Sequence, residues 1–228
     1  ATQATALGKN NINLGSITTI PNAYNEMGRD AITALTTRGW TITGGRFAPD
    51  CVSPDYYVSM WDMSQPAVTG TATDLVTNLW GTNFVVEWKN TADSTDRGII
   101  SPATTTTAPL TITGLTAGKR YRVIAYANPS NPSSTFSKLA TMKGGGYTTL
   151  TDAQRLDSVT QWGANKWMSL DSAFFHCSRM DVTATDVPDL RGVKDLSFMF
   201  YHCDSLVYNP TINTWRTDSI TNMRDMFG

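Results

Sequence analysis

The residue types best suited to chemistry stand in two matched pairs, His176-Cys177 and His202-Cys203. Imidazole nitrogen and thiolate sulfur are ligands that zinc prefers, so four such side chains on neighbouring segments could hold one ion. Side chains of adjacent residues normally point in different directions, however, and structural zinc sites use spaced pairs of ligands. We interpret each pair as a repeated structural position, with cysteine as a small buried filler and histidine at the rim. We therefore predict no metal site.

The cysteines also bear on disulfide formation. The chain has 3 cysteines, Cys51, Cys177 and Cys203, and none is spaced as a CxxC redox pair. A disulfide between Cys177 and Cys203 would require Cα atoms within about 7 Å of each other. We favour free thiols.

The sequence offers few candidate residues for a catalytic site or a calcium site. The chain has 2 histidines, and neither has a serine or cysteine partner that sequence can assign to a triad. A glycosidase-like pair of carboxylates stays open, because it needs only Asp and Glu. Several aspartates could bind calcium, but no Asp-rich loop has the spacing of a dedicated site, so we expect solvated turns. These aspartates are Asp93, Asp96, Asp181, Asp186 and Asp189.

Aromatic side chains could line a sugar-binding face or fill the core and caps of the fold. Their alternation with polar neighbours favours the core, and an exposed aromatic platform for glycans is the alternative. The aromatic residues concerned are Tyr56, Tyr57, Trp61, Trp80, Trp88, Trp162, Trp167 and Trp215.

Composition limits the class of protein. The 228 residues are 40% apolar, 10% aromatic and 16% charged, with a net charge of -1. A largely uncharged polar surface rich in Thr, Ser and Asn is typical of extracellular or virion β-proteins. Lys and Arg are not concentrated in any window dense enough to form a phosphate-binding stripe, so we expect no nucleic-acid partner. The sequence contains no apolar run of membrane-spanning length.

A sequence repeat near the C-terminus contains the two His-Cys pairs and must position them. Segments starting at Trp167, Val193 and Ile220 share one pattern at offsets of 26 and 27 residues. Self-similarity at such a period is typical of a solenoid, in which each coil buries its apolar side against the next. We predict two buried ladders, one of Leu170, Leu196 and Met223 and one of Phe174, Phe200 and Phe227.

In the middle of the chain, apolar and polar residues alternate as they do in β-strands. Leu115 precedes Tyr121 by six residues across a glycine-containing turn, a spacing that suits the tyrosine corner of a β-sandwich. We therefore predict a sandwich at about residues 80–143, with Leu115 buried and the Tyr121 hydroxyl bonded back to the chain. Residues 89–109 are rich in Thr, Ser and Asp and are predicted to be an exposed loop. The alternating stretches are residues 84–88, 110–113 and 121–126.

The N-terminal segment has the features of a cap on a solenoid. Apolar spacing predicts a helix in residues 20–35 that starts at Pro21 and Asn22, and residues 40–43 alternate as a short strand. Residues 7–14 suit one coil. The chain starts without Met and stops partway through a repeat, so we expect it to be an internal piece of a longer protein.

Several spaced motifs carry a resemblance to a known family. They resemble the BspA-like leucine-rich repeat family of bacterial surface proteins, whose repeats run through a tryptophan, a valine or isoleucine and a Met-x-x-Met-Phe signature. The resemblance covers roughly residues 150–228. Residues 84–126 look like an immunoglobulin-like, PKD or fibronectin type III sandwich, although Glu87-Trp-Lys-Asn90 replaces the PKD motif Trp-Gly-Asp-Gly. The repeat motifs are Trp162-Gly163, Ala173-Phe-Phe-His-Cys177, Met199-Phe-Tyr-His-Cys203, Trp215-Arg-Thr-Asp-Ser-Ile220 and Asn222-Met-Arg-Asp-Met-Phe227.

This resemblance implies a mainly β fold in which leucine-rich-repeat-type solenoid segments flank an immunoglobulin-like β-sandwich. Residues 1–47 would end one solenoid with a helical C-terminal cap. Residues 48–145 would form a linker and the sandwich. Residues 146–228 would form an N-terminal cap and the first repeats of a second solenoid.

The implied role is adhesion or display at a bacterial surface or in a bacteriophage fibre, outside the cell. We expect a non-catalytic part of such a protein that binds a surface glycan or protein, with other copies present if it forms a fibre. No catalytic residue, cofactor or metal is implied. The alternative is an accessory region of a secreted enzyme whose catalytic domain lies outside these residues.

Overall fold

The chain divides into two compact units, Ala1–Ser53 and Pro54–Gly228. The computed structural model describes the second unit almost continuously and the first only in short pieces. Helix is confined to two 3-10 turns, η2 (Ala153–Arg155) and η3 (Ile212–Thr214), which confirms the mainly β class for the described residues. No helix among them is long and apolar enough to cross a membrane. The described residues are 52–68, 70–105, 108–141, 150–207, 209 and 211–228, with short pieces at 11–13, 23–24, 39, 41–43 and 46–47.

The first unit contains two short parallel strand pairs. Strand β1 (Asn11–Asn13) pairs with β3 (Thr41–Thr43), which lies in the stretch predicted to be a strand. Strand β2 (Ala23–Tyr24) pairs with β4 (Arg46–Phe47). The prediction of a helix starting at Pro21 is therefore wrong at these two residues, because their backbone groups join a ladder. The apolar face of that predicted helix lies outside the described residues.

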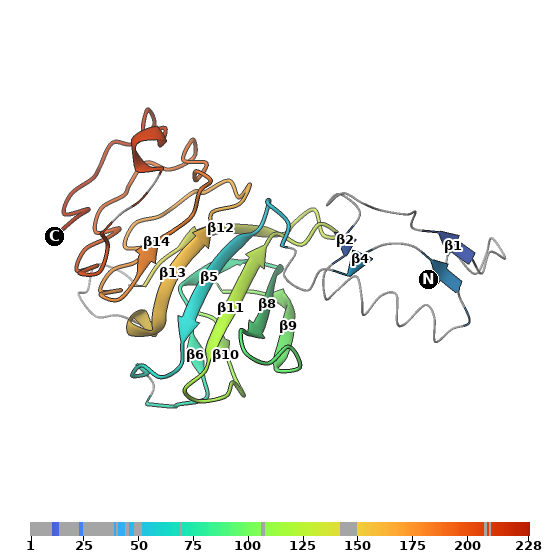
Figure 1. The fold of residues 1–228 in the computed structure, drawn as a ribbon. Coiled ribbons are helices and arrows are strands. Elements are labelled where there is room, and N and C mark those ends of the chain that lie inside the picture. The colour runs from blue at the N-terminus through green and yellow to red at the C-terminus, as the bar shows by residue number, and fades with distance from the viewer. Residues whose placement is uncertain are drawn as a thin grey trace. The chain divides into compact units, whose positions relative to one another are not determined.

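The second unit is built on a six-stranded sheet in the order β14-β13-β5-β11-β8-β9. Every adjacent pair is antiparallel except β13 and β14, which are parallel. Figure 1 shows β13, β5, β11 and β8 crossing the unit side by side. The strands are β5 (Tyr57–Asp62), β8 (Phe84–Asn90), β9 (Arg97–Ala103), β11 (Arg120–Tyr126), β13 (Leu156–Gln161) and β14 (Asp181–Val182).

Two small antiparallel sheets contribute the other side of the core. Strand β6 (Leu75–Val76) pairs with β10 (Thr111–Ile112), and β7 (Leu79–Thr82) pairs with β12 (Thr135–Leu139). Alternate residues of the large sheet, such as Tyr57 and Val123, point inward and join Leu79 and Phe136 in one buried cluster. Period-2 alternation thus gives each strand one apolar face, and the layers bury those faces against each other.

The strands predicted from alternation are present, and several other strands were not predicted. β8, β10 and β11 lie in the three predicted stretches. The predicted loop at residues 89–109 is wrong over β9, whose Ile99 and Ile100 pair opposite Glu87 and Val86. β12 was also missed, because its short pattern follows a cluster of turn residues.

Residues after β13 form coils made of tight turns. In the turn Leu170 to Ala173, the N–H of the fourth residue donates to the carbonyl of the first at 3.1 Å. In five of these turns the third residue is left-handed, for example His176 with φ 60° in the turn in which the N–H of Cys177 donates to the carbonyl of Phe174. The residues at this position are Ser172, His176, Phe198, His202 and Asp225, with φ between 51° and 60°.

A parallel backbone ladder joins successive coils. The N–H of Phe174 donates to Met199 O at 2.9 Å, and the N–H of Phe200 donates to Met226 O at 2.9 Å. Every second residue of the segments 172–176 and 196–202 donates in this way, so the coils are held in register over these segments. The other donors are Ser172, His176, Leu196, Phe198 and His202, which pair with Ser197, Tyr201, Asn222, Arg224 and Gly228.

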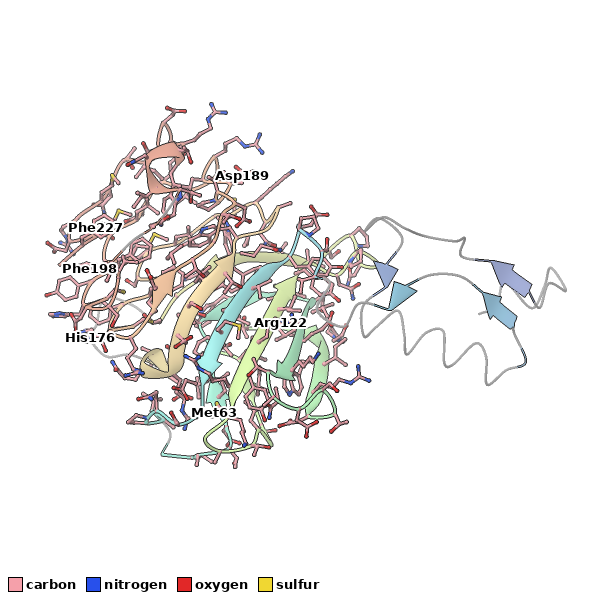
Figure 2. All side chains as sticks on the ribbon, in the orientation of Figure 1. Met63, Arg122, His176, Asp189, Phe198 and Phe227 are labelled. Carbon is pink, nitrogen blue, oxygen red and sulfur yellow. The ribbon has the colours of Figure 1, made fainter. Side chains whose placement is uncertain are left out.

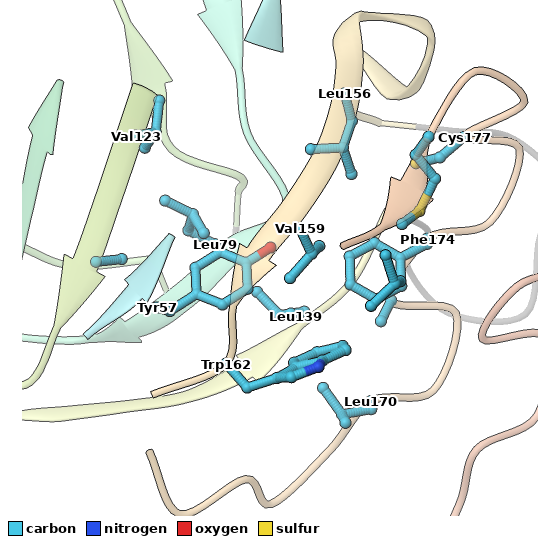
Figure 3. Packing of buried hydrophobic residues seen from close by; sticks show 14 of the residues in the cluster. Tyr57, Leu79, Val123, Leu139, Leu156, Val159, Trp162, Leu170, Phe174 and Cys177 are labelled. Carbon is cyan, nitrogen blue, oxygen red and sulfur yellow. The ribbon is translucent and has the colours of Figure 1, made fainter. Parts of the chain in front are cut away.

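The first coil is closed by the strands that precede it. Met168 N–H donates to Ser137 O at 2.8 Å, and Thr141 N–H donates to Ser172 O at 3.0 Å. The Asn78 side chain donates to Ala173 O at 2.9 Å. β12 and the residues after it therefore occupy the place of a preceding coil. Figure 3 shows the buried residues continuing from Val123 through Trp162 to Phe174.

Candidate functional site: the aromatic rim of the coils

The two predicted ladders are in register, but their last members are exposed. The rings of Phe174 and Phe200 stack with centroids 5.5 Å apart, and Phe200 and Phe227 repeat this at 5.5 Å. Leu170, Leu196, Phe174 and Phe200 are buried. The predicted burial is wrong for Met223 and Phe227, which are 49% and 56% exposed. Both lie on the last coil, which has a neighbouring coil on one side only among the described residues.

The His-Cys pairs split between the inside and the outside of the coils. Cys177 and Cys203 are free and buried, and the Cys203 thiol donates to Phe174 O at 3.1 Å. Burial raises the pKa of the Cys177 thiol well above normal and that of Cys203 to about 12. His176 is partly exposed and His202 is exposed. The thiols and imidazoles therefore cannot share one ion, and Cys51 lies outside the described residues.

The histidines belong to a group of rings that we call the aromatic rim: Phe175, His176, Phe198, Tyr201 and His202. Phe175 and Tyr201 stack at 5.4 Å with planes 8° apart, and Phe198 meets Tyr201 edge-on at 5.6 Å. The His176 and His202 rings are 4.7 Å apart. In Figure 2, the labelled His176 and Phe198 lie along the outer edge of the coils.

Charged groups lie beside the aromatic rim, and the environment of His176 shifts its pKa. Partial burial lowers the pKa of His176, the nearby His202 lowers it further, and Asp204 opposes both. The Asp204 carboxylate lies 3.9 Å from Nδ1 of His202. The Arg224 guanidinium lies 4.9 Å from the Phe198 ring centre, within cation–π range. Such a surface can stack on planar or apolar groups and offers polar ring edges.

The aspartates considered for calcium are each held by nearby donors. The Asp186 carboxylate, for example, accepts the N–H groups of Trp162 and Gly163 at 2.8–3.0 Å. Within the described ranges, no group of three or more His, Cys, Asp or Glu side chains could hold a metal ion. The other donors are Thr95 to Asp93, Tyr121 to Asp96, Val182 to Asp181 and Arg191 to Asp189.

The aromatic residues considered for a glycan platform lie mostly in the core. Tyr56 and Trp88 are partly buried. Tyr56 stacks on Tyr126 at 3.8 Å. The remaining ones are buried: Tyr57, Trp61, Trp80, Trp162, Trp167 and Trp215. In the aromatic rim, His176 and Tyr201 are partly exposed and His202 is exposed, whereas Phe175 and Phe198 are buried beneath them. Sequence reasoning missed this group, although the repeated Phe-Phe-His and Phe-Tyr-His triplets carry its signal.

The predicted sandwich corner has a defined geometry. Leu115 is 2% exposed, and the Tyr121 hydroxyl accepts the Thr116 N–H at 2.7 Å. The same hydroxyl donates to the Asp96 carboxylate, which also accepts the Asn90 side-chain amide at 2.9 Å. The sequence indicated the return bond to the backbone but not the aspartate. Asp96 comes from the segment that was predicted to be a loop.

Comparison with protein families gives a match to part of the chain. Residues 168–228 match the family model described as Mycoplasma protein of unknown function, DUF285. Comparison with curated proteins and with solved structures gave no match. The match lies in the coil segment and is consistent with the resemblance to BspA-like surface proteins there.

Proposed function

We propose that this chain is a non-catalytic part of a long bacterial surface adhesin or bacteriophage tail or head fibre, and that it binds a surface glycan or protein outside the cell. The observation that carries the proposal is the DUF285 match over residues 168–228, which coincides with the stacked coils. A solenoid offers equivalent positions along an extended face, which suits broad or repetitive ligands.

The proposed architecture gives each region a role. Residues 146–228 form the cap and first coils of a leucine-rich-repeat-type solenoid, which the parallel backbone ladder supports. Residues 48–145 form a linker and an immunoglobulin-like β-sandwich, supported by the layered antiparallel strands and the tyrosine corner. Residues 1–47 end another solenoid, supported by the parallel pairs β1–β3 and β2–β4.

The aromatic rim is the proposed contact surface. Tyr201 combines a partly exposed ring with stacking on Phe175, so its position is fixed before a ligand arrives. Rigid aromatic side chains lose little conformational entropy on binding and are enriched at binding hot spots. Tyrosine also offers a hydroxyl to a sugar or a peptide.

Binding of the full 228-residue chain to bacterial and host cells tests this proposal. We expect saturable binding that Tyr201→Ala weakens at least tenfold. Lys194→Ala is the matched control, because Lys194 is exposed on the same coil but outside the aromatic rim. Periodate oxidation of the cell surface would abolish binding to a glycan, and protease treatment would abolish binding to a protein.

Two outcomes would contradict the proposal. One is an absence of binding to every surface tried, and the other is equal binding by Tyr201→Ala and the unaltered chain. The alternative role, an accessory region of a secreted enzyme, requires a catalytic domain in the adjoining sequence. Determining the sequence of the intact protein distinguishes the two.

A further inference from the structure

The histidines of the aromatic rim occupy equivalent positions on neighbouring coils. Each is the left-handed third residue of its turn, with φ 60° at His176 and 55° at His202. Their ring centres lie 4.7 Å apart. Two imidazoles that bind one zinc ion, with Zn–N bonds of about 2.0–2.1 Å, have ring centres about 5 Å apart. The spacing of the two rings thus suits a shared ion.

The backbone holds both histidines in place without any ion. His176 N–H donates to Tyr201 O at 2.8 Å, and the Gln154 side chain donates to His176 O at 2.9 Å. His202 N–H donates to Gly228 O at 3.1 Å. Because the coil ladder fixes both Cα positions, a shared ion needs adjustment of the side chains alone.

A carboxylate completes the surroundings of the pair. Asp204 Oδ1 lies 3.9 Å from Nδ1 of His202, which is within ion-pair range but beyond hydrogen-bond distance. Metal-binding histidines commonly turn their second nitrogen toward a carboxylate, which orients the ring. The side chains of His202 and Asp204 are 47% and 70% exposed, so an ion can reach them from solvent.

We propose that His176 and His202 together bind one divalent transition-metal ion, such as Zn²⁺, and that this ion links the two coils. Water molecules fill the remaining positions, since the described residues contain no cluster of three or more suitable side chains. Imidazole ligands favour Zn²⁺ and Cu²⁺ over Mg²⁺ and Ca²⁺. The buried thiols of Cys177 and Cys203 do not take part.

Titration of the full chain with Zn²⁺ tests this inference. The chain has 2 histidines, so nuclear magnetic resonance can follow both rings without overlap. We expect both sets of ring signals to move together along one saturable curve with a stoichiometry of one ion per chain. Affinity should fall as pH falls through the range of histidine protonation, because the ion needs neutral imidazole.

Substitutions distinguish Zn²⁺ binding at the two histidines from Zn²⁺ binding elsewhere on the surface. His176→Gln and His202→Gln should each weaken Zn²⁺ binding at least tenfold, and Asp204→Asn should weaken it less. Arg216→Gln is the control, since the Arg216 side chain is 76% exposed on another part of the coils. The inference is overturned if the two rings titrate independently, or if either histidine variant binds as the unaltered chain does. It does not depend on the proposed function, which Tyr201→Ala tests separately.

Discussion

At the scale of single residues, Tyr121 joins two segments of the layered strands by hydrogen bonds. Its hydroxyl accepts the Thr116 N–H and donates to Asp96, so Tyr121→Phe removes one neutral and one charge-assisted hydrogen bond. We expect a loss of about 2 kcal/mol in the free energy of unfolding, since bonds to charged groups are worth about 1.5–3 kcal/mol. Urea denaturation of the variant and the unaltered chain measures this change in the free energy of unfolding. Tyr201→Phe is the control and should change stability by less than about 0.5 kcal/mol.

The same corner makes stability depend on pH. Burial by itself would raise the pKa of Asp96, but hydrogen bonds from Tyr121, Asn90 and Thr116 outweigh it and hold the pKa below its usual value. An aspartate has a pKa of about 3.9 in the unfolded chain. Its contribution is therefore complete above about pH 4 and is lost as the pH falls through the lower pKa of the folded state.

Asp96→Asn isolates this contribution. We expect the variant to be less stable than the unaltered chain near pH 7 by about 1–2 kcal/mol, because the charged acceptor is gone. The difference should shrink as the pH falls below about 4. Denaturant unfolding at a series of pH values measures both curves. A difference that stays constant down to about pH 2 would contradict the assignment.

The phenylalanine ladder offers a matched pair of substitutions. Phe200 is 2% exposed and lies between Phe174 and Phe227, so Phe200→Ala should cost about 3–5 kcal/mol. Phe227 is 56% exposed and has a ring on one side, so Phe227→Ala should cost less than about 1.5 kcal/mol. Equal losses of unfolding free energy in the two variants would contradict the placement of Phe200 between two coils and Phe227 on the last one.

At the scale of elements, η2 together with its N-cap residue contains a buried ion pair whose two side chains hydrogen-bond to backbone groups of the segment that follows β5. Arg155 and Asp152 lie 3.6 Å apart with side chains 2% and 0% exposed. Arg155 donates to Gln65 O and Asp74 O, and Asp152 accepts the Val76 N–H. These hydrogen bonds replace those that the two charged side chains would make to water if they were exposed.

Removing one partner of this pair should destabilise the fold. We expect Arg155→Met to lower the free energy of unfolding by about 3–5 kcal/mol, because Asp152 is left charged and buried. The double variant Asp152→Asn with Arg155→Met should recover part of that loss. Thermal unfolding of the two variants measures the difference. Arg216→Met, at an exposed position, should leave stability within about 0.5 kcal/mol.

Elements with a strong local pattern were predictable from the sequence, and elements defined by distant partners were not. Alternation over residues 84–88 and 121–126 indicated β8 and β11, and the coils repeat at offsets of 26 and 27 residues. β9 was mistaken for a loop because it stands among Thr, Ser and Asp and gains its ladder only from β8. The aromatic rim also needs coil stacking to form, since Phe175 meets Tyr201 from the next coil.

At the scale of the whole second unit, the strands and the coils share one core. β13 pairs with β5 on one side and with β14 on the other, so a single sheet runs from the layered strands into the coils. Buried residues form one cluster that includes Val123 of β11 and Phe200 of the coils. The first coil also hydrogen-bonds to β12. We infer that the coils unfold when the layered strands unfold.

Val123→Ala tests this coupling from a position outside the coils. Val123 is fully buried in β11, and its truncation should lower the stability of the unit by about 2 kcal/mol. Amide hydrogen exchange reports the free energy of opening at each N–H. If the unit opens as a whole, the N–H of Phe174, which donates to Met199 O, should lose as much protection as the N–H groups of β8. Unchanged protection of Phe174 in this variant would mean that the coils are stable by themselves, and that a boundary near residue 145 separates two independent folding units.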